Sequence, residues 1–322
     1  MNNNIKLKKN CSIIAVFILF VIILTGCATP ERQRIVVDIF WDTALLLNVT
    51  RITDDGFAKS WARVSPDGTR MLYTESTRNV QRTNYSNIYE YWNIMLLRDI
   101  NSPAKTPMLD EYAYAPSWYE DSNAFLFSVI ERGGSRIVRM SIGGGGRTYI
   151  SRYPLGGGDT RPVIRGGIIL CDTEINRRRQ IISMRDDGME VTVLGEGHSP
   201  FWHPTLNKFL FIRNGNIFEM DLENIQVTQL HSDPNYNCAM PSYSPNGEHI
   251  IFQKGGELKA GGSRQAARWQ IFIIRADGAG LSPLTVPEVD SWSPSWDMNN
   301  NIYFVSNASG SSEIYRARIN FE

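Results

Sequence analysis

Residues 62–76 read ARVSPDGTRMLYTES, and the same pattern recurs in PSYSPNGEHIIFQKG (241–255) and PSWDMNNNIYFVSNA (294–308). Each stretch has an apolar anchor residue, a tight turn of the Ser-Pro-Asp-Gly kind, and a short apolar strand. Looser copies are PSWYEDSNAFLFSVI (116–130) and PFWHPTLNKFLFIRN (200–214). Recurrence of one module along a chain predicts a repeat architecture, in which every copy builds the same structural unit.

The spacing of the copies indicates their number. We align them on the residue before the turn, and the widest gap leaves room for a degenerate copy, RPVIRGGIILCDTEI (161–175). The anchors are then Val64, Trp118, Val163, Trp202, Tyr243 and Trp296, with spacings of 54, 45, 39, 41 and 53 residues. These values bracket the roughly 40–50 residues of a four-stranded propeller blade. The sequence therefore predicts six blades.

Alternation of apolar and polar residues after each copy favours strands over helices. WNIMLLRDI from Trp92 and WQIFIIRAD from Trp269 are examples, rich in β-branched and aromatic residues. A β-sandwich is the alternative, but sandwiches do not repeat at blade length. We therefore expect an all-β fold, a six-bladed β-propeller with four-stranded antiparallel blades.

The two ends of the repeat region complement each other. The last copy stops after its third strand, whereas the first is preceded by an unassigned strand in LNVTRIT from Leu47. We expect residues Asn48–Thr53 to supply the missing outer strand of the last blade. Such closure removes the free sheet edge that would otherwise pair with other chains.

The pattern P-x-W-S-P-D-G-x-x-I-x-F followed by I-x-x-M-D-x-D-G resembles the WD40-like (PD40) repeats of TolB-type β-propellers, and the resemblance covers about residues 47–322. It implies a periplasmic, non-enzymatic scaffold that binds partner proteins. The same repeats occur in the non-catalytic half of prolyl oligopeptidases and in oligogalacturonate lyases. The sequence has no room for the α/β domain that precedes the propeller in TolB, which argues against a TolA-like partnership.

The first residues indicate the compartment. Lysines at positions 6, 8 and 9 precede the apolar run SIIAVFILFVIIL (12–24), and Leu24-Thr25-Gly26-Cys27 resembles a lipobox. This is the organisation of a bacterial signal peptide; an uncleaved membrane anchor is the alternative. We expect a lipoprotein signal peptide at 1–26, a lipidated tether and lead-in segment at 27–46, and the propeller at 47–322, with acyl chains on Cys27. Ala28 after the cysteine favours the outer membrane, facing the periplasm.

Composition argues against several classes of function. Lys and Arg total 33 and Asp and Glu total 33, so net charge does not indicate nucleic-acid binding. Cys171 and Cys238 fall in different repeats and are expected to be separate thiols. The histidines are His198, His203, His231 and His249, and they suggest no metal cluster. The Gly143–Gly146 run follows a strand and precedes another, so it is a turn and not a phosphate loop. We expect no catalytic residues, cofactor or metal, and predict that the protein is not an enzyme.

Two sets of residues are candidates for recognition. The first set consists of acids on the connections between blades, which we expect at the channel mouth: Asp55, Asp110, Asp159, Asp233 and Asp290. They either cap backbone N–H groups or form a polar rim that binds a cation or a partner. Two long loops, Ser76–Tyr91 and Lys254–Arg268, account for the wide spacings and lie on the same face as those connections. The partner-binding face predicted there comprises Arg78, Arg82, Tyr85, Tyr89, Tyr91, Arg178, Lys259, Arg264 and Arg268.

Mixed Arg and Tyr side chains are typical of protein interfaces, although ordinary surface loops are the alternative. The sequence thus favours a monomeric, lipid-anchored envelope propeller that binds a protein or peptide. The second hypothesis is glycan binding, with polysaccharide processing at His198, in which aromatic residues near the mouth stack on sugars. Trp118, Trp202 and Trp296 are instead expected to wedge between blades.

Overall fold

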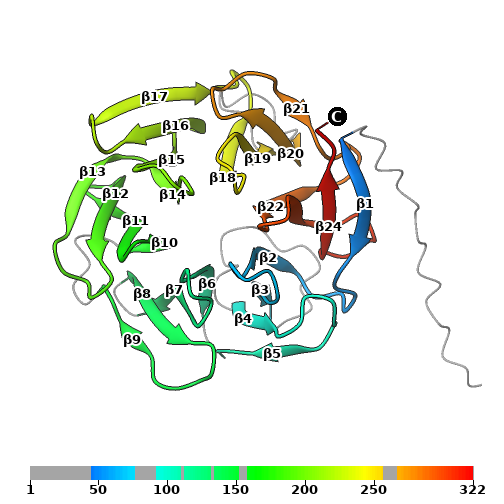
Figure 1. Ribbon diagram of the computed structural model, residues 1–322, viewed down its shortest axis with the longest axis horizontal. Helices are drawn as coiled ribbons and strands as arrows, with labels where there is room; N and C mark the ends of the chain where they lie inside the picture. The colour runs from blue at the N-terminus through cyan, green and yellow to red at the C-terminus, as the bar shows by residue number, and fades with distance from the viewer. Residues whose placement is uncertain are drawn as a thin grey trace, which may run out of the picture. The chain divides into compact units, whose positions relative to one another are not determined.

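A computed structural model describes residues 45–76, 92–109, 112–131, 134–151, 158–256 and 267–321. Within these ranges the chain forms 24 strands and no helix, grouped in six four-stranded antiparallel sheets. The sheets surround a common centre like the blades of a propeller, in chain order from blue to red (Figure 1). The predicted fold class is confirmed. No helix in the part of the chain that the structure describes has the length and apolar character needed to cross a membrane.

Each blade runs from an innermost to an outermost strand, and the first five blades take their strands in sequence order. Blade 1 contains β2 (Lys59–Val64), β3 (Met71–Ser76), β4 (Trp92–Leu97) and β5 (Lys105–Pro107). Blade 2 contains β6 (Ala113–Trp118), β7 (Ala124–Glu131), β8 (Gly134–Ser141) and β9 (Thr148–Tyr149). Blade 3 contains β10 (Thr160–Arg165), β11 (Ile168–Ile175), β12 (Arg178–Arg185) and β13 (Thr192–Glu196). Blade 4 contains β14 (His198–Trp202), β15 (Lys208–Arg213), β16 (Asn216–Asp221) and β17 (Gln226–His231). Blade 5 contains β18 (Asn237–Tyr243), β19 (His249–Gly256), β20 (Ala267–Arg275) and β21 (Ser282–Pro283).

Blade 6 is assembled from both ends of the described chain. Its inner strands are β22 (Ser291–Trp296), β23 (Asn301–Ser306) and β24 (Glu313–Ile319), and its outer strand is β1 (Leu46–Arg51). β1 and β24 are antiparallel, with Leu46 opposite Ile319 and Thr50 opposite Arg316. The predicted closure is therefore confirmed, although the strand lies two residues earlier than the expected 48–53.

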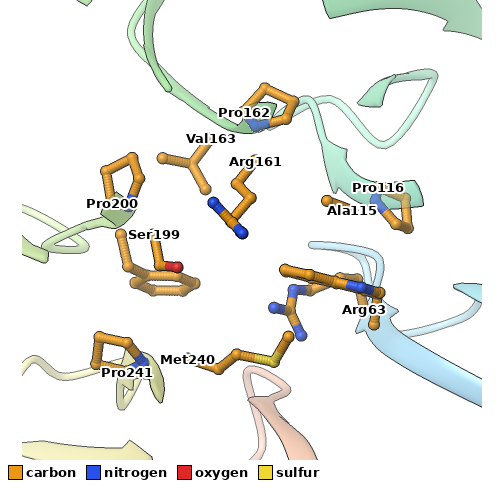
Figure 2. Close-up of a pocket in the computed structure, with 12 residues that line it drawn as sticks. Arg63, Ala115, Pro116, Arg161, Pro162, Val163, Ser199, Pro200, Met240 and Pro241 are labelled. Atoms are coloured by element: carbon orange, nitrogen blue, oxygen red, sulfur yellow. The ribbon is translucent and has the colours of Figure 1, made fainter. Parts of the chain in front are cut away.

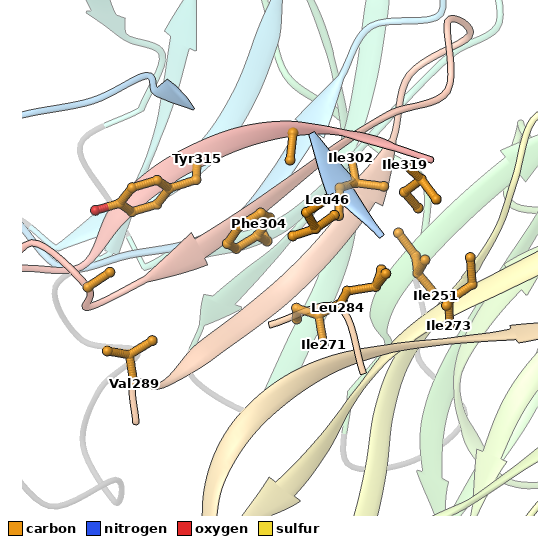
Figure 3. Packing of buried hydrophobic residues seen from close by; sticks show 12 residues of the cluster. Leu46, Ile251, Ile271, Ile273, Leu284, Val289, Ile302, Phe304, Tyr315 and Ile319 are labelled. Atoms are coloured by element: carbon orange, nitrogen blue, oxygen red, sulfur yellow. The ribbon is translucent and has the colours of Figure 1, made fainter. Parts of the chain in front are cut away.

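The hydrophobic core is divided into six clusters, one at each interface between neighbouring blades. At the closing interface, Ile251 and Ile271 of blade 5 pack against Ile302 and Phe304 of blade 6, with Leu46 of β1 beside them (Figure 3). Trp118, Trp202 and Trp296 each lie in such a cluster, which confirms that they wedge between blades. Burial of these faces holds the blades together because a single blade cannot cover both of its own apolar faces.

A buried ion-pair network stabilises the seam between blades 6 and 1. The side chains of Lys59 on β2 and Glu313 on β24 are fully buried, and their charged atoms lie 3.1 Å apart. Glu313 also accepts hydrogen bonds from Thr53 Oγ1 at 2.7 Å and from the Gly56 amide at 2.8 Å. These contacts fix the segment that leads from β1 to β2, and so they join the outer strand of blade 6 to the inner strand of blade 1.

Every innermost strand is interrupted by a β-bulge. The pairing register with the second strand shifts in all six blades. At each shift one residue has a positive φ of 51–56°: Trp61, Ala115, Arg161, Ser199, Met240 and Ser293. In five blades the next residue is a proline, which lacks the N–H that a regular ladder would need. The proline of the repeat thus marks the position of the bulge. The bulge reorients the side chain of the residue that precedes the proline.

The bulge in β10 shows that the anchor predicted for the third repeat is wrong by one residue. Pro162 is equivalent to Pro116, so the residue equivalent to Trp118 is Ile164 and not Val163 as predicted. Ile164 packs at the interface with the preceding blade 2, whereas Val163 contacts the cluster shared with blade 4. Because strand side chains alternate in direction, an alignment error of one residue assigns the wrong face.

The turns after the anchors form as predicted. The Gly68 amide donates to the Ser65 carbonyl at 2.8 Å, and Gly68 has a φ of +73°. In blade 4 His203 replaces the serine, and its Nδ1 accepts from the backbone amides of Thr205 and Leu206 at 3.2 and 3.0 Å. Burial lowers the pKa of His203 to about 4, so the neutral ring serves as a turn cap.

Candidate functional site

A pocket lies between the innermost strands and is the candidate site. The empty space between its lining atoms, open solvent included, amounts to about 360 Å³. Its lining residues come from β2, β6, β10, β14 and β18: Trp61, Arg63, Ala115, Pro116, Arg161, Pro162, Val163, Ser199, Pro200, Phe201, Met240 and Pro241. Five of the six positive-φ residues are among them, so the bulges supply much of the wall. We call this pocket the channel pocket.

Arg161 extends into the channel pocket, as Figure 2 shows. Its Nη1 lies 2.7 Å from a carboxylate oxygen of Asp172, whose side chain is fully buried on β11. Nη1 of Arg179, from β12, lies 3.3 Å from the same oxygen. The other oxygen accepts the Ser199 amide at 3.1 Å. The Asp172 carboxylate therefore bridges the guanidinium groups of Arg161 and Arg179.

Arg63 lines the pocket from β2, and its side chain is turned toward the pocket interior in Figure 2. It donates to the carbonyls of Ala62 and Pro294 at 2.9 and 3.5 Å and lies 5.8 Å from the centre of the Trp61 ring. Desolvation lowers the pKa of Arg63 to about 10, which leaves it charged at neutral pH. Among the described residues, no carboxylate forms an ion pair with this guanidinium group.

His198 begins β14 next to the arginine cluster. Its Nδ1 lies 3.0 Å from the Ser199 hydroxyl. Burial, and then the positive charge of Arg161, lowers the pKa of His198 to about 4. The imidazole is therefore neutral at physiological pH. In the ranges that the structure describes, no group of three or more His, Cys, Asp or Glu side chains is arranged to hold a metal ion.

Those predicted channel-mouth acids that the structure describes form ion pairs or hydrogen bonds with other residues of the chain. Asp55 pairs with Lys59 and Lys105, and although burial opposes it, these hydrogen bonds lower the pKa of Asp55 to about 2. Asp233 pairs with Lys254 at 3.1 Å and accepts two backbone amides.

The remaining acids of this set are Asp290, Asp159 and Asp110. Asp290 accepts the Trp269 amide at 3.0 Å. Asp159 is buried, and desolvation raises its pKa. Asp110 lies outside the described residues. Asp233 and Asp290 thus cap backbone N–H groups, and Asp55 and Asp233 form ion pairs with lysines.

The predicted partner-binding face is described at two positions. Arg178 is exposed and lies 3.6 Å from Glu196, and Arg268 donates to the Glu288 carbonyl at 2.5 Å. Both follow the loop between the second and third strands of their blades, so they lie on the same face as the connections between blades. The other residues of this set lie outside the described residues: Arg78, Arg82, Tyr85, Tyr89, Tyr91, Lys259 and Arg264.

Sequence reasoning missed the residues that line the channel pocket. Arg161, Trp61 and Met240 belong to no motif, because the residue at the bulge varies between copies and only Ser199 and Ser293 share a residue type. The available signal was positional: in four blades the residue before the repeat proline occupies the bulge and lines the channel pocket. The sequence analysis selected Arg178, which is exposed to solvent, and not its neighbour Arg179, which contacts Asp172.

Comparison with known proteins supports the fold. No protein-family model and no curated protein matches the sequence. Among solved structures, TolB from Acinetobacter baumannii is similar with a TM-score of 0.56 and 15% identity. The alignment covers 80% of this chain and 66% of that one, so the chain spans about two thirds of the length of that TolB.

Two enzymes share the architecture. Oligogalacturonate lyase from Vibrio parahaemolyticus is similar with a TM-score of 0.53, 12% identity, and coverage of 85% of this chain and 94% of that one. A gluconolactonase from Xanthomonas campestris gives a TM-score of 0.60, 8% identity, and coverage of 84% and 89%. The prediction that the protein is not an enzyme is therefore contradicted, because this propeller fold also carries a lyase and a lactonase. At these sequence identities the similarity concerns the fold alone. The chain has a TolB-like six-bladed β-propeller fold.

Proposed function

We propose that the protein binds a peptide segment of another cell-envelope protein, with the segment entering the channel pocket. The observation that supports this proposal is the lining of the channel pocket. Its walls are apolar, formed by prolines, Phe201, Met240 and Trp61, and they surround a few charged groups. Binding sites commonly combine apolar walls with a few polar groups that fix orientation. Aromatic, Met and Arg side chains are also enriched in protein interfaces.

The two long loops extend this proposed site. They join β3, which ends at Ser76, to β4, which begins at Trp92, and β19, which ends at Gly256, to β20, which begins at Ala267. These strand ends lie on the same face as the connections between blades. Loops on a rigid scaffold commonly carry recognition. Their Arg, Lys and Tyr residues would contact the partner around the channel mouth.

A capture experiment from bacterial membranes tests this proposal. We expect a variant with both loops replaced by short Gly-Ser links to capture at least about tenfold less partner, a loss of about 1.4 kcal/mol in binding free energy. The matched control is Val227→Ala on the exposed outer strand β17, which should capture as wild type does. Capture unchanged by trimming both loops would contradict the proposal.

We also propose that the protein is anchored by acyl chains on Cys27 and faces the periplasm from the outer membrane. The support is the sequence LTGC at 24–27 after an apolar run. In cells given a radiolabelled fatty acid, the wild-type protein should carry the label and fractionate with outer membranes. Cys27→Ser should lose the label, whereas Cys238→Ser, which removes a buried thiol, should keep it. Equal labelling of the Cys27→Ser variant would show that the lipid is not on this residue.

Glycan binding is the second candidate function. The observation that favours it is the Trp61 ring in the channel pocket beside Arg63, since an aromatic face and a guanidinium group can together hold an acidic sugar. Binding of oligogalacturonate that depends on Trp61 would support it over peptide binding.

A further inference from the structure

Large apolar side chains are exposed along one side of the propeller. This side is formed by the turns between first and second strands and between third and fourth strands, and we call it the turn face. The two kinds of turn meet there: in blade 4 the Leu222 amide donates to the Asn207 carbonyl at 3.0 Å. In the described parts of the opposite face, which carries the connections between blades, Tyr112 alone is a large apolar side chain exposed to a comparable degree. On the turn face the exposed apolar side chains come from blades 3 to 6 and are 40–76% exposed: Met189, Leu206, Ile225, Leu281, Met298 and Phe321.

The exposure of Ile225 has a conformational cost. This residue lies in the turn from β16 to β17, is 76% exposed and has a φ of +53°. A β-branched side chain is strained in this left-handed region, which glycine and asparagine adopt readily. Other turns of this face use those residues there, with Gly280 at +71° and Asn300 at +61°. Because the Ile225 side chain buries little surface in the fold and strains its turn, it favours a role in binding.

The chain that precedes the propeller is joined to it at the turn face. β1 begins at Leu46, and β24, beside it, ends at Ile319. The Leu45 carbonyl accepts the Asn320 amide at 2.9 Å. The third strand of a blade ends at the turn face, so the 44 residues before Leu45 are connected there. Acyl chains on Cys27, as proposed above, would hold this side of the protein near a bilayer.

We propose that the turn face docks on the surface of a phospholipid bilayer, with its apolar side chains in the interfacial region and the channel mouth directed away from the lipid. This inference rests on the proposed lipid anchor and adds the orientation of the propeller on it. The peptide-binding site would then stay accessible to a partner while the protein lies on the membrane.

The arrangement of the apolar side chains fits a bilayer better than a protein partner. They project from separate turns of four blades, and polar residues such as Asp187, Glu223 and Asn299 lie close to them in the chain. A fluid interface accepts separate apolar projections while the polar neighbours remain among the headgroups. A protein interface instead needs a contiguous, closely packed apolar core.

Photo-crosslinking to phospholipid tests this orientation in cells that produce the full chain and are grown with radioactive phosphate. Benzoylphenylalanine replaces Ile225 or, as the matched control, Asn235, which is exposed on the connection from blade 4 to blade 5. We expect at least about tenfold more phosphate label on the protein from position 225, because only this position would reach the lipid. The label reports phospholipid adducts alone, since the acyl chains on Cys27 carry no phosphate.

A second variant tests the other turns of this face. Leu206→Asn/Met298→Asn should lower the phosphate label from position 225 while leaving the unfolding midpoint near that of the parent protein. Both side chains are more than half exposed, so their replacement removes contact with lipid and little packing in the fold. Phosphate label from position 225 that the double variant does not change would contradict docking by the whole face.

The outcomes separate this inference from the anchor on which it rests. Equal phosphate label from positions 225 and 235, or none from position 225, in protein that carries fatty acid on Cys27 would overturn the docking and leave the anchor standing. Adducts of position 225 with a protein and without phosphate would assign the turn face to a protein partner and also overturn it. Phosphate label from position 225 in a chain that carries no fatty acid on Cys27 would contradict the anchor and support lipid binding by the turn face.

Discussion

Glu313→Ala is expected to lower the free energy of unfolding by about 3–5 kcal/mol, the cost of leaving one partner of a buried ion pair unpaired. Lys59 and Glu313 are both fully buried and 3.1 Å apart. The variant would also remove the acceptor of Thr53 Oγ1 and of the Gly56 amide. Because Asp55 still contacts Lys59, we expect a value near the lower end of this range. Equilibrium denaturation with urea measures it.

Two control variants separate charge from packing. Glu313→Gln keeps one oxygen acceptor and most of the volume, so its loss should be smaller than that of Glu313→Ala. The double variant Lys59→Met/Glu313→Leu removes both charges together and should recover much of the stability, as replacement of buried ion pairs by apolar residues commonly does. An unchanged unfolding midpoint for Glu313→Ala would show that the seam between blades 6 and 1 is not held by this network.

The architecture was predictable because propeller blades repeat their chemistry along the chain. Trp118, Trp202 and Trp296 fill equivalent gaps between blades, so similar side chains recur at a measurable spacing. The unassigned strand near residue 47 revealed the closure of the ring, because blade 6 lacked an outer strand without it. The error at Val163 arose where the repeat has lost its aromatic anchor, since Val163 and Ile164 are equally apolar and only the bulge shows which one faces blade 2.

The candidate site was harder to predict, because it depends on what differs between blades. Trp61, Ala115, Arg161, Ser199 and Met240 occupy the same bulge position with different side chains, so no motif marks them. The ion pairs of the predicted acids were equally hard to predict from the sequence. Asp55 and Lys105 lie 50 residues apart in sequence and come into contact only in the folded protein. The expectation that the protein is not an enzyme came from family resemblance and from absent motifs, and the same fold in a lyase and a lactonase shows that neither decides activity.

Photo-crosslinking from within the channel pocket tests whether a partner protein binds there. A benzoylphenylalanine placed at Ala115, on β6, would project into the channel pocket. The substitution suits the backbone because Trp61 carries a large aromatic side chain at the equivalent bulge position, with a φ of 56° against 54° for Ala115. The control position is Val227 on the exposed outer strand β17. On irradiation of intact cells, we expect a covalent adduct with a specific envelope protein from position 115 and none from position 227. The same adducts from both positions, or an adduct from position 227 alone, would contradict it.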